Sequence, residues 1–498
     1  MATIKINQFH GISPRTHPSL LSDGMAVEAH NCRLKSGKLV PLREPARMGE
    51  HTVNLEGDIS QISEANSLIL WRHENTFEFL AFAGFVDKAA GNIADDEYDR
   101  IFLTGDTCHS WDGHDNVPTV YLRDKNKTGT QIIRQPIPKN PLPAPYAKLS
   151  TENGAVQDKD NTRYTYYFQT WVDPYGYESG ASDPSENWNP NANGIGSGAY
   201  TKDALEYNDG DAVLFLALTD EQVPEGGGTV NSPTAGYKRR FYKVISGSET
   251  GTAQFVAEFD TDPWGPKTIR VKDEDAGESM PLFESAPYDL RNMTYVPGGF
   301  YVGFSPRNPK TVMFSEVGVP TSWPQAYRYD LRDNIVALAV STNTVFALTD
   351  GFPCVISGTA PDSMTVSMLA GPAACVSKRS VCLYKNAVCY ATNTGIGMIS
   401  SSATIGTTVN NLTEKVFTKE QWQAYNPSSC LMAQHDGALF CFFTLADAAK
   451  TRRGLVVDLL ESENAVTTHD EQSTCLCIDD AADELFFVRS ANSGKEGD

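Results

Sequence analysis

The sequence is poor in positive charge relative to negative charge. It contains 41 Lys and Arg against 62 Asp and Glu in 498 residues, so the formal net charge is −21. A protein that binds along a nucleic-acid backbone needs clustered Lys and Arg side chains. The composition therefore disfavours tight nucleic-acid binding, and predicts a soluble protein whose surface repels DNA.

Long apolar runs and paired cysteine motifs are also missing. No apolar run approaches the ~18 residues of a membrane span, and the start Met1–Asn7 lacks the apolar centre of a secretory signal. We therefore expect no membrane insertion. None of the ten cysteines forms a C-x-x-C pair, and several fall inside apolar strand patterns. We expect small buried side chains in a chain made in a reducing cytosol, rather than metal ligands or disulfides.

The common catalytic motifs are absent. The chain has no G-x-S-x-G or S-x-x-K motif, and Gly226-Gly227-Gly228 lacks the Lys-Ser/Thr and the helix of a phosphate-binding loop. The nine His are dispersed, without the partners of a triad. We expect neither an enzyme nor a cofactor, although a triad assembled from distant residues stays open at this point.

One turn carries four side chains that could ligate a metal ion. They are His109, Asp112, His114 and Asp115. The donors are crowded on a turn with no organising element and no second cluster. This favours a solvated turn between strands over a metal site.

Three acidic groups could supply glycosidase carboxylates or calcium ligands. They are Asp158 with Asp160, Asp260 with Asp262, and Asp273-Glu274-Asp275. All lie in predicted turns, where Asp side chains cap backbone amides. The structural role is therefore favoured for each.

A repeat of short aromatic strands predicts the architecture. The strands centre on Tyr301, Phe346, Tyr390, Phe440 and Phe486, at intervals of 45, 44, 50 and 46 residues, each beside a turn signal. A unit of this length has room for about four short strands and no long helix, as in a β-propeller blade. The best helix candidate is 418–425, where a capping box precedes a short run that a proline ends.

The pattern predicts an all-β protein with an interrupted propeller of about six blades. We expect an extended N-terminal arm in 1–50, a first blade in 51–135, a Pro-rich linker with an inserted β-sandwich in 136–290, five further blades in 291–490 and a flexible tail in 491–498. A closed ring of blades removes exposed sheet edges.

The predicted arm differs in charge from the rest. Residues 1–50 hold seven Lys and Arg against four Asp and Glu, a net charge of +3, which leaves −24 for the remainder. Such an arm is suited to an acidic surface of its own subunit or of a neighbour. Chance variation in charge is the other explanation.

Several aromatic residues fall on predicted loops. They are Trp188, Trp264, Trp323, Tyr175 and Tyr177. Such side chains stack on sugars in some proteins, but more often they fill gaps between blades or subunits. Packing is therefore the favoured role.

Several segments together resemble the tail nozzle proteins (tail tubular protein B-like) of short-tailed bacteriophages. The resembling segments are Gly11–Arg15, Asp23–Cys32, Ser36–Arg43, Tyr164–Val172, Tyr175–Ala181, Pro184–Ser185, Ser315–Pro324, Thr349–Pro353, Gly358–Pro361, Ala374–Ser380 and Tyr390–Ile396. Each segment alone has little specificity for the family. The resemblance lies in the order of the segments along most of the chain.

The resemblance implies a structural virion protein, made in the bacterial cytoplasm and built into the tail. Nozzle proteins of this family form a homohexameric ring below the portal and adaptor, with tail fibres as further neighbours. DNA passes through the lumen of this ring without specific binding. No catalytic residue is implied. The arm would clasp a neighbouring subunit, with candidate contacts Ile4, Ile6, Phe9, Gly11, Ile12, Pro14, Arg15, Arg33 and Arg43. In the inserted domain the candidate turn residues are Asp173, Gly176 and Glu178.

Two other functions stay open. A glycan-binding or glycan-cleaving propeller of a host-recognition device would use the loop tryptophans and turn carboxylates. A cytosolic scaffold propeller that binds peptides fits the arm less well.

Overall fold

The computed structural model describes residues 9–489 with several internal gaps. The gaps are 36–37, 49–51, 74–75, 92, 94–95, 112, 136–145, 150–159, 161, 190–191, 194–197, 216–235, 245–252, 261–265, 372–373, 403–405, 445–453 and 461–464. The predicted tail and the linker prolines lie outside the described residues, as do Ile4 and Ile6.

Seven small sheets make up the larger part of the molecule. Two precede the inserted segment: β3 (Val53–Glu56), β4 (Ser67–His73) and β5 (Thr76–Phe82), then β6 (Val86–Ala90), β7 (Ile101–Gly105), β8 (Thr119–Leu122) and β9 (Gln131–Arg134). Two sheets directly follow it: β20 (Arg291–Val296), β21 (Phe300–Ser305), β22 (Asn308–Phe314) and β23 (Arg328–Asp330), then β24 (Ile335–Ser341), β25 (Thr344–Thr349), β26 (Cys354–Ser357) and β27 (Thr365–Met368).

The last three sheets complete the set. They are β28 (Cys382–Tyr384), β29 (Ala387–Ala391), β30 (Ile396–Ser402) and β31 (Gly406–Asn411); β32 (Leu431–His435), β33 (Ala438–Phe442), β34 (Gly454–Asp458) and β35 (Val466–His469); and β36 (Ser473–Asp479) with β37 (Glu484–Arg489). Apart from the parallel pair β3 and β5, neighbouring strands within these sheets are antiparallel and consecutive in the chain or one hairpin apart.

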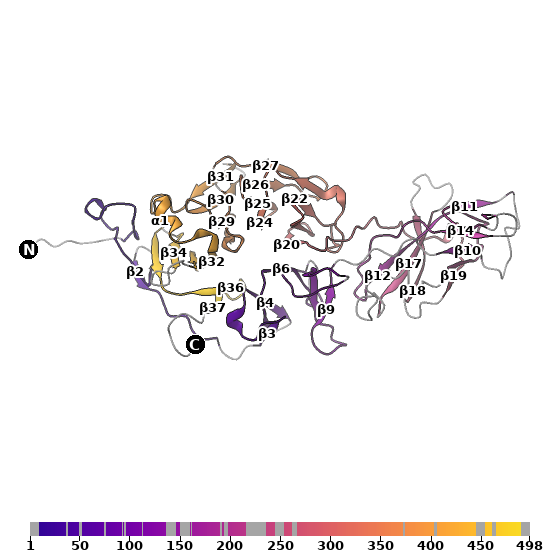
Figure 1. Cartoon of the computed structure of the whole chain (residues 1–498), viewed down its shortest axis with the longest axis horizontal. Helices are drawn as coiled ribbons and strands as arrows, with labels where there is room; N and C mark the ends of the chain where they lie inside the picture. Colours follow the sequence, from indigo (N-terminus) through magenta and orange to yellow (C-terminus); the bar gives the residue numbers. More distant parts are fainter. Residues whose placement is uncertain are drawn as a thin grey trace, which may run out of the picture.

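The seven sheets close into a ring around a common centre (Figure 1). Each sheet buries apolar side chains against the next. The first and second sheets share a cluster that contains Trp71 and Leu103. The last and first sheets share another, which contains Val488 and Phe79, and this contact closes the circle. The fold is therefore a β-propeller, as predicted.

The aromatic repeat marks the second strand of each of the last five sheets. Tyr301, Phe346, Tyr390, Phe440 and Phe486 lie in β21, β25, β29, β33 and β37. The side chains of Tyr301, Phe346 and Tyr390 are fully buried between blades. This repeated position explains the near-constant spacing along the chain.

The number of blades differs from the expected count. We expected one blade in 51–135, whereas the described residues there form two sheets. Leu68–Trp71 and Phe79–Ala83 belong to the first sheet, and Arg100–Leu103 to the second. The division is hidden because β6 carries Asp87 and Lys88 in its middle, which weakens its strand pattern.

The segment between β9 and β20 forms a separate β-sandwich. Its sheets are β14 (Ala199–Thr201), β13 (Asn187–Asn189), β10 (Ala147–Leu149), β16 (Val213–Phe215) and β19 (Lys267–Ile269); β12 (Tyr167–Val172), β17 (Lys238–Val244) and β18 (Ala253–Asp260); and the pair β11 (Arg163–Thr165) and β15 (Leu205–Tyr207). Phe215 and Phe241 meet in the core between the two larger sheets, with ring centroids 4.6 Å apart. The domain projects from one side of the ring (Figure 1).

Helix is scarce in the described residues. The predicted helix is present as α1 (Lys419–Gln423), and Thr418 and Gln421 form the expected capping box. Short 3₁₀ turns are η1 (Pro18–Leu20), η2 (Ile62–Glu64), η6 (Asp273–Asp275), η7 (Gln325–Tyr327), η8 (Lys378–Ser380) and η9 (Pro427–Ser429). Within the part of the chain that the structure covers, no helix has the length and apolar character to cross a membrane.

Candidate functional sites

The N-terminal arm lies along the outer strand of its own propeller. Ile12 N donates to Val466 O at 2.9 Å, Asn31 N to Thr468 O at 2.8 Å, and Thr468 N to Ala29 O at 2.9 Å. The arm thus covers the edge of β35, whose unpaired backbone groups would otherwise face solvent or another chain. The arm also contains the antiparallel hairpin of β1 (Cys32–Lys35) and β2 (Lys38–Pro41).

Charge fixes the arm to the same blade. Arg33 Nη1 donates to Asp436 Oδ2 at 2.8 Å, and Arg33 Nη2 donates to the Asp436 main-chain oxygen at 2.9 Å. Lys35 Nζ lies 3.3 Å from the same carboxylate. Two basic residues of the arm thus share one carboxylate of their own subunit, and the fit of the arm to a wider acidic surface stays a prediction.

Most predicted arm residues have their described contacts within the chain. Ile12 is 3% exposed in the core between the β28–β31 and β32–β35 sheets, and Phe9 packs against that core. Arg15 donates to Glu414 O at 2.6 Å, and Pro14 O accepts from Gln421 Nε2 at 2.9 Å. The backbone of Gly11, at φ +90°, passes so close to Val466 that a Cβ there would lie 2.7 Å from Val466 N. A role between subunits stays a prediction for these residues and for the exposed Arg43.

The turn that contains Asp173 and Gly176 is a closed structural element. Asp173 Oδ1 accepts hydrogen bonds from Tyr175 N at 2.9 Å and Tyr177 N at 2.8 Å, while Gly176 supplies the left-handed residue at φ +93°. Burial raises the pKa of the Asp173 carboxyl to about 6, against the lowering effect of the two amides. The carboxylate therefore caps backbone and is partly protonated near pH 6.

Glu178 is buried and fully engaged. Its Oε1 accepts from Thr170 Oγ1 and from Tyr242 OH, each at 2.5 Å, and its Oε2 lies 3.0 Å from Arg240 Nη1. These partners satisfy the charge inside the β-sandwich. Glu178 is thus a structural carboxylate of the inserted domain.

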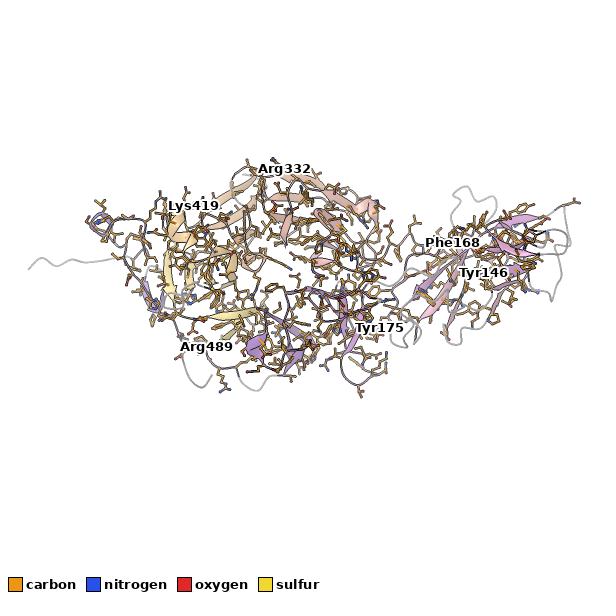
Figure 2. All side chains as sticks on the ribbon, in the orientation of Figure 1. Tyr146, Phe168, Tyr175, Arg332, Lys419 and Arg489 are labelled. Carbon is orange, nitrogen blue, oxygen red and sulfur yellow. The ribbon has the colours of Figure 1, made fainter. Side chains whose placement is uncertain are left out.

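The same turn joins the inserted domain to the propeller. The Arg100 guanidinium lies 5.1 Å from the ring centre of Tyr177 and 5.4 Å from that of Tyr98, and its Nε is 2.7 Å from Asp96 Oδ2. Tyr175 packs edge-on against Tyr98 with ring centroids 5.1 Å apart. Figure 2 shows Tyr175 where the two parts of the molecule meet. The tyrosines that we expected to pack do so, at this joint.

The two histidines of the 109–115 turn are not brought together. His109 Nε2 lies 2.9 Å from Tyr121 OH, whereas the His114 ring stacks on Tyr288 with centroids 4.2 Å apart. Asp115 accepts from Ser110 at 2.7 Å, and Asp112 lies outside the described residues. Within the described residues, His109, His114 and Asp115 do not form a group whose ligand atoms lie close enough to share a metal ion.

His109 instead meets two residues that the sequence did not connect with it. Ligand atoms of Glu56, Cys108 and His109 lie within 4.8 Å of one another, close enough to share a metal ion. Tyr121 OH donates to Glu56 Oε2 at 3.2 Å. Burial raises the pKa of the Cys108 thiol to about 11 and lowers that of His109, so the thiol is protonated near neutral pH. The Cys108 thiol would have to lose this proton to bind a metal ion.

The remaining acidic and aromatic candidates have mainly structural surroundings. Asp273 pairs with Lys243 at 2.6 Å and Arg163 at 2.5 Å. Trp323 is completely buried. Trp188 differs, since it is 39% exposed and its ring lies 5.2 Å from that of Tyr200. Asp158, Asp262 and Trp264 lie outside the described residues.

The cysteines match the expectation for small buried side chains, with one exception. All ten are free, eight are buried and Cys477 is half-buried. Even Cys382 and Cys389, directly opposite on β28 and β29, remain unlinked. Cys108 is the exposed one.

A central cavity was not anticipated. It has a volume of about 380 Å³ and is lined by the innermost strands of all seven sheets, with Asp87, Lys88, Lys378 and Arg379 among its walls. The sequence signal was two adjacent charged pairs, Asp87-Lys88 and Lys378-Arg379, inside otherwise apolar or buried segments. They lie about 290 positions apart, so only the closed ring brings them to one place.

Comparison with known proteins gives no family assignment. No family model matches the chain, and neither does any curated protein. Solved structures that match include the WD40 domain of Neurospora crassa Pan2 (10% identity, 50% of this chain, 79% of that chain, TM-score 0.28) and Kluyveromyces lactis Hsv2 (9%, 56%, 66%, 0.27). AztD from Citrobacter koseri also matches (11%, 65%, 76%, 0.25). Likeness at this level says nothing of function.

Proposed function

We propose that this protein is a structural virion protein that forms the ring-shaped nozzle of a short bacteriophage tail. The observation that carries the proposal is the order of the nozzle-like segments along the architecture. Gly11–Arg15 lies in the docked arm, Tyr164–Val172 in the inserted domain, and Ser315–Pro324 and Ala374–Ser380 in loops of the propeller. The resemblance thus follows arm, insertion and blades in sequence.

The surroundings of these segments support a building role. In the Ser315–Pro324 loop, the buried Trp323 donates its Nε1–H to Pro320 O at 2.8 Å. In the Tyr175–Ala181 segment, Glu178 accepts from Tyr242 OH in the inserted domain, and the amides of Tyr175 and Tyr177 donate to the neighbouring Asp173. The charged groups of these segments hold the architecture in place, as a component of a rigid assembly requires.

The conduit would lie between subunits and not inside one propeller. A central cavity of about 380 Å³ is at the small end of the range for small-molecule sites and cannot admit a DNA duplex. A ring of identical subunits generates an axial channel if a heterologous interface repeats and closes, and we propose six copies. The net charge of −21 suits such a channel, because a basic lumen would retain the DNA.

The projecting domain offers a platform for neighbouring tail proteins. It stands on the joint formed by Tyr98, Arg100 and Tyr177, which holds it away from the ring. We propose the adaptor ring and the tail fibres as neighbours of the assembled particle.

Native mass spectrometry of the purified full chain tests the assembly. We expect a homohexamer, together with ring-shaped particles in electron micrographs. A protein that stays monomeric over a wide concentration range, and that is missing from purified virions by peptide mass spectrometry, would contradict the proposal.

Glycan binding is the second candidate, and Trp188 is the observation that favours it. Its exposed ring forms an aromatic group with Tyr200, whose ring lies 4.8 Å from that of Tyr146. Exposed aromatic faces stack on sugars. A glycan array and a polysaccharide-hydrolysis assay separate the two candidate functions. Specific glycan binding that Trp188→Ala abolishes would favour a glycan-binding protein. An array without binding and an assay without hydrolysis would favour the nozzle.

A further inference from the structure

The central cavity is positively charged in an otherwise acidic protein. Three cationic side chains, Lys88, Lys378 and Arg379, and one carboxylate, Asp87, line it. The cavity thus carries a net charge of 3 − 1 = +2, while the whole chain carries −21. Concave sites lined by one sign of charge concentrate counter-ions.

Lys88 has no anionic partner in the described residues. Its Nζ donates to the main-chain oxygen of Leu70 at 2.8 Å. Burial lowers the pKa of this amine, while the electrostatic effects of Cys477, Asp480 and Asp479 act in the opposite direction. Asp479 itself is held by Arg72. Among the described residues no carboxylate forms an ion pair with Lys88, so its Nζ can still pair with an anion in the cavity.

Arg379 is in the same position on the other side of the ring. It donates to the main-chain oxygen of Thr474 and lies over the ring of Phe85, 5.1 Å from its centre. Burial lowers the pKa of its guanidinium. Neither a carbonyl nor an aromatic ring neutralises a full charge, so a guanidinium with free donors remains suited to an anion.

Lys378 and Asp87 form the only ion pair among the described cavity residues. Lys378 Nζ lies 2.5 Å from Asp87 Oδ2, and the same oxygen accepts from Asn292 N at 3.1 Å. The single carboxylate is therefore occupied by its own partners. Two cations remain available across the cavity.

We propose that this cavity binds a small, multiply charged anion that carries phosphate or carboxylate groups. Lys88 and Arg379 bind the charged groups, and the volume of about 380 Å³ limits the ligand to a small molecule. Because the ligand contacts several innermost strands, it stabilises the ring of blades through linkage of binding and folding. The site belongs to one subunit, so it is independent of how subunits assemble.

The test is isothermal titration calorimetry on the full chain with sodium pyrophosphate and with sodium citrate. Sodium chloride at equal ionic strength is the reference. We expect saturable binding of at least one of the two anions and a higher melting temperature in its presence. Binding of pyrophosphate alone indicates a phosphate ligand, and binding of citrate alone a carboxylate ligand. The absence of binding by both would overturn the proposal.

Two substitutions in the cavity and one control outside it test the location of the binding site. Lys88→Met and Arg379→Met should each weaken binding by about tenfold, the loss of one charge-assisted contact of ~1.4 kcal/mol. Lys419→Met, on the exposed start of α1, is the matched control and should bind like the wild type. Circular dichroism verifies that each variant folds.

Asp87→Asn tests the charge balance in the opposite direction. It removes the carboxylate while an amide oxygen can still accept from Asn292 N, so binding should become about three to ten times tighter. This variant keeps the test decisive if a methionine variant does not fold. Equal affinity in Lys88→Met, Asp87→Asn and Lys419→Met would contradict a site at these residues.

Discussion

Arg33 of the arm donates two hydrogen bonds to the turn between β32 and β33, one to Oδ2 and one to the main-chain oxygen of Asp436. The distances are 2.8 and 2.9 Å, and the Arg33 side chain is only 11% exposed. This contact ties residue 33 to residue 436 and covers the outer edge of a blade. The arm is thus part of the propeller before it can contact any neighbour.

Arg33→Ala should loosen the arm. The substitution removes both contacts, and we expect a loss of unfolding free energy of about 1 kcal/mol, modest because Asp436 is partly exposed to solvent. Urea denaturation measures the loss, and limited proteolysis should cut the arm faster. Lys38→Ala, at an exposed lysine of the same arm, is the control and should behave like the wild type.

Deletion of residues 1–15 should distinguish the role of the arm in packing on its own propeller from its role in assembly of the subunits into a ring. The deletion removes Ile12 from the core and uncovers part of β35, so we expect a folded but less stable propeller that no longer forms rings. Ile12→Ala should cost about 2–4 kcal/mol of stability as a core truncation, yet keep the ring because the first eight residues remain. Native mass spectrometry and thermal unfolding of both variants give the comparison. A deletion variant that still forms normal rings would exclude an inter-subunit role for the arm.

Asp173→Asn should stabilise the inserted domain at neutral pH. The folded-state pKa of Asp173 is raised to about 6, so the native state holds its proton more tightly than the unfolded chain. Stability from this group is full below pH ~4 and falls as the pH rises to about 6. We expect the asparagine variant, which keeps the cap, to be more stable by about 1–3 kcal/mol at pH 7.5.

Calorimetric unfolding at several pH values measures this difference between the Asp173→Asn variant and the wild type. The difference should vanish near pH 4. A difference that is the same at pH 4 and pH 7.5 would show that the buried carboxyl does not titrate as described.

His469→Phe should weaken the acid sensitivity of the blade that carries the arm. Burial lowers the pKa of His469 to about 4, and its Nε2 lies 3.1 Å from Cys441 O. Because the native state holds its proton less tightly than the unfolded chain, stability is full above pH ~6.5 and falls as the pH drops towards 4. The wild type should lose about 1–3 kcal/mol over this window.

Denaturant unfolding at pH 7.5 and pH 4.5 compares the two proteins. The phenylalanine variant should lose less free energy of unfolding than the wild type when the pH falls from 7.5 to 4.5. At pH 7.5 it should be less stable than the wild type, because it lacks the hydrogen bond. Identical pH slopes would contradict a role for His469.

The sequence predicts local, periodic features well. The aromatic strands at Tyr301 to Phe486 identify the later blades, because each aromatic residue lies in the second strand of its sheet. Thr418 and Gln421 identify the one α-helix of the described residues through a local capping pattern. Features that depend on a few neighbouring residues could therefore be predicted.

Features that depend on closure of the ring could not be predicted from the sequence. Lys88 and Arg379 line one cavity because blades about 290 residues apart face the same centre, and nothing local in the sequence indicates it. The same holds for Glu56 and His109, which meet through Tyr121. The extra blade was missed because the charged pair that lines the cavity, Asp87-Lys88, interrupts the apolar pattern of β6.

Electron cryomicroscopy of the purified, assembled protein tests the central claim most directly. The account predicts a six-fold ring of propellers with an axial channel between subunits that is wide enough for a DNA duplex and lined mainly by acidic side chains. Isolated monomers, or a closed assembly without such a channel, would contradict a nozzle.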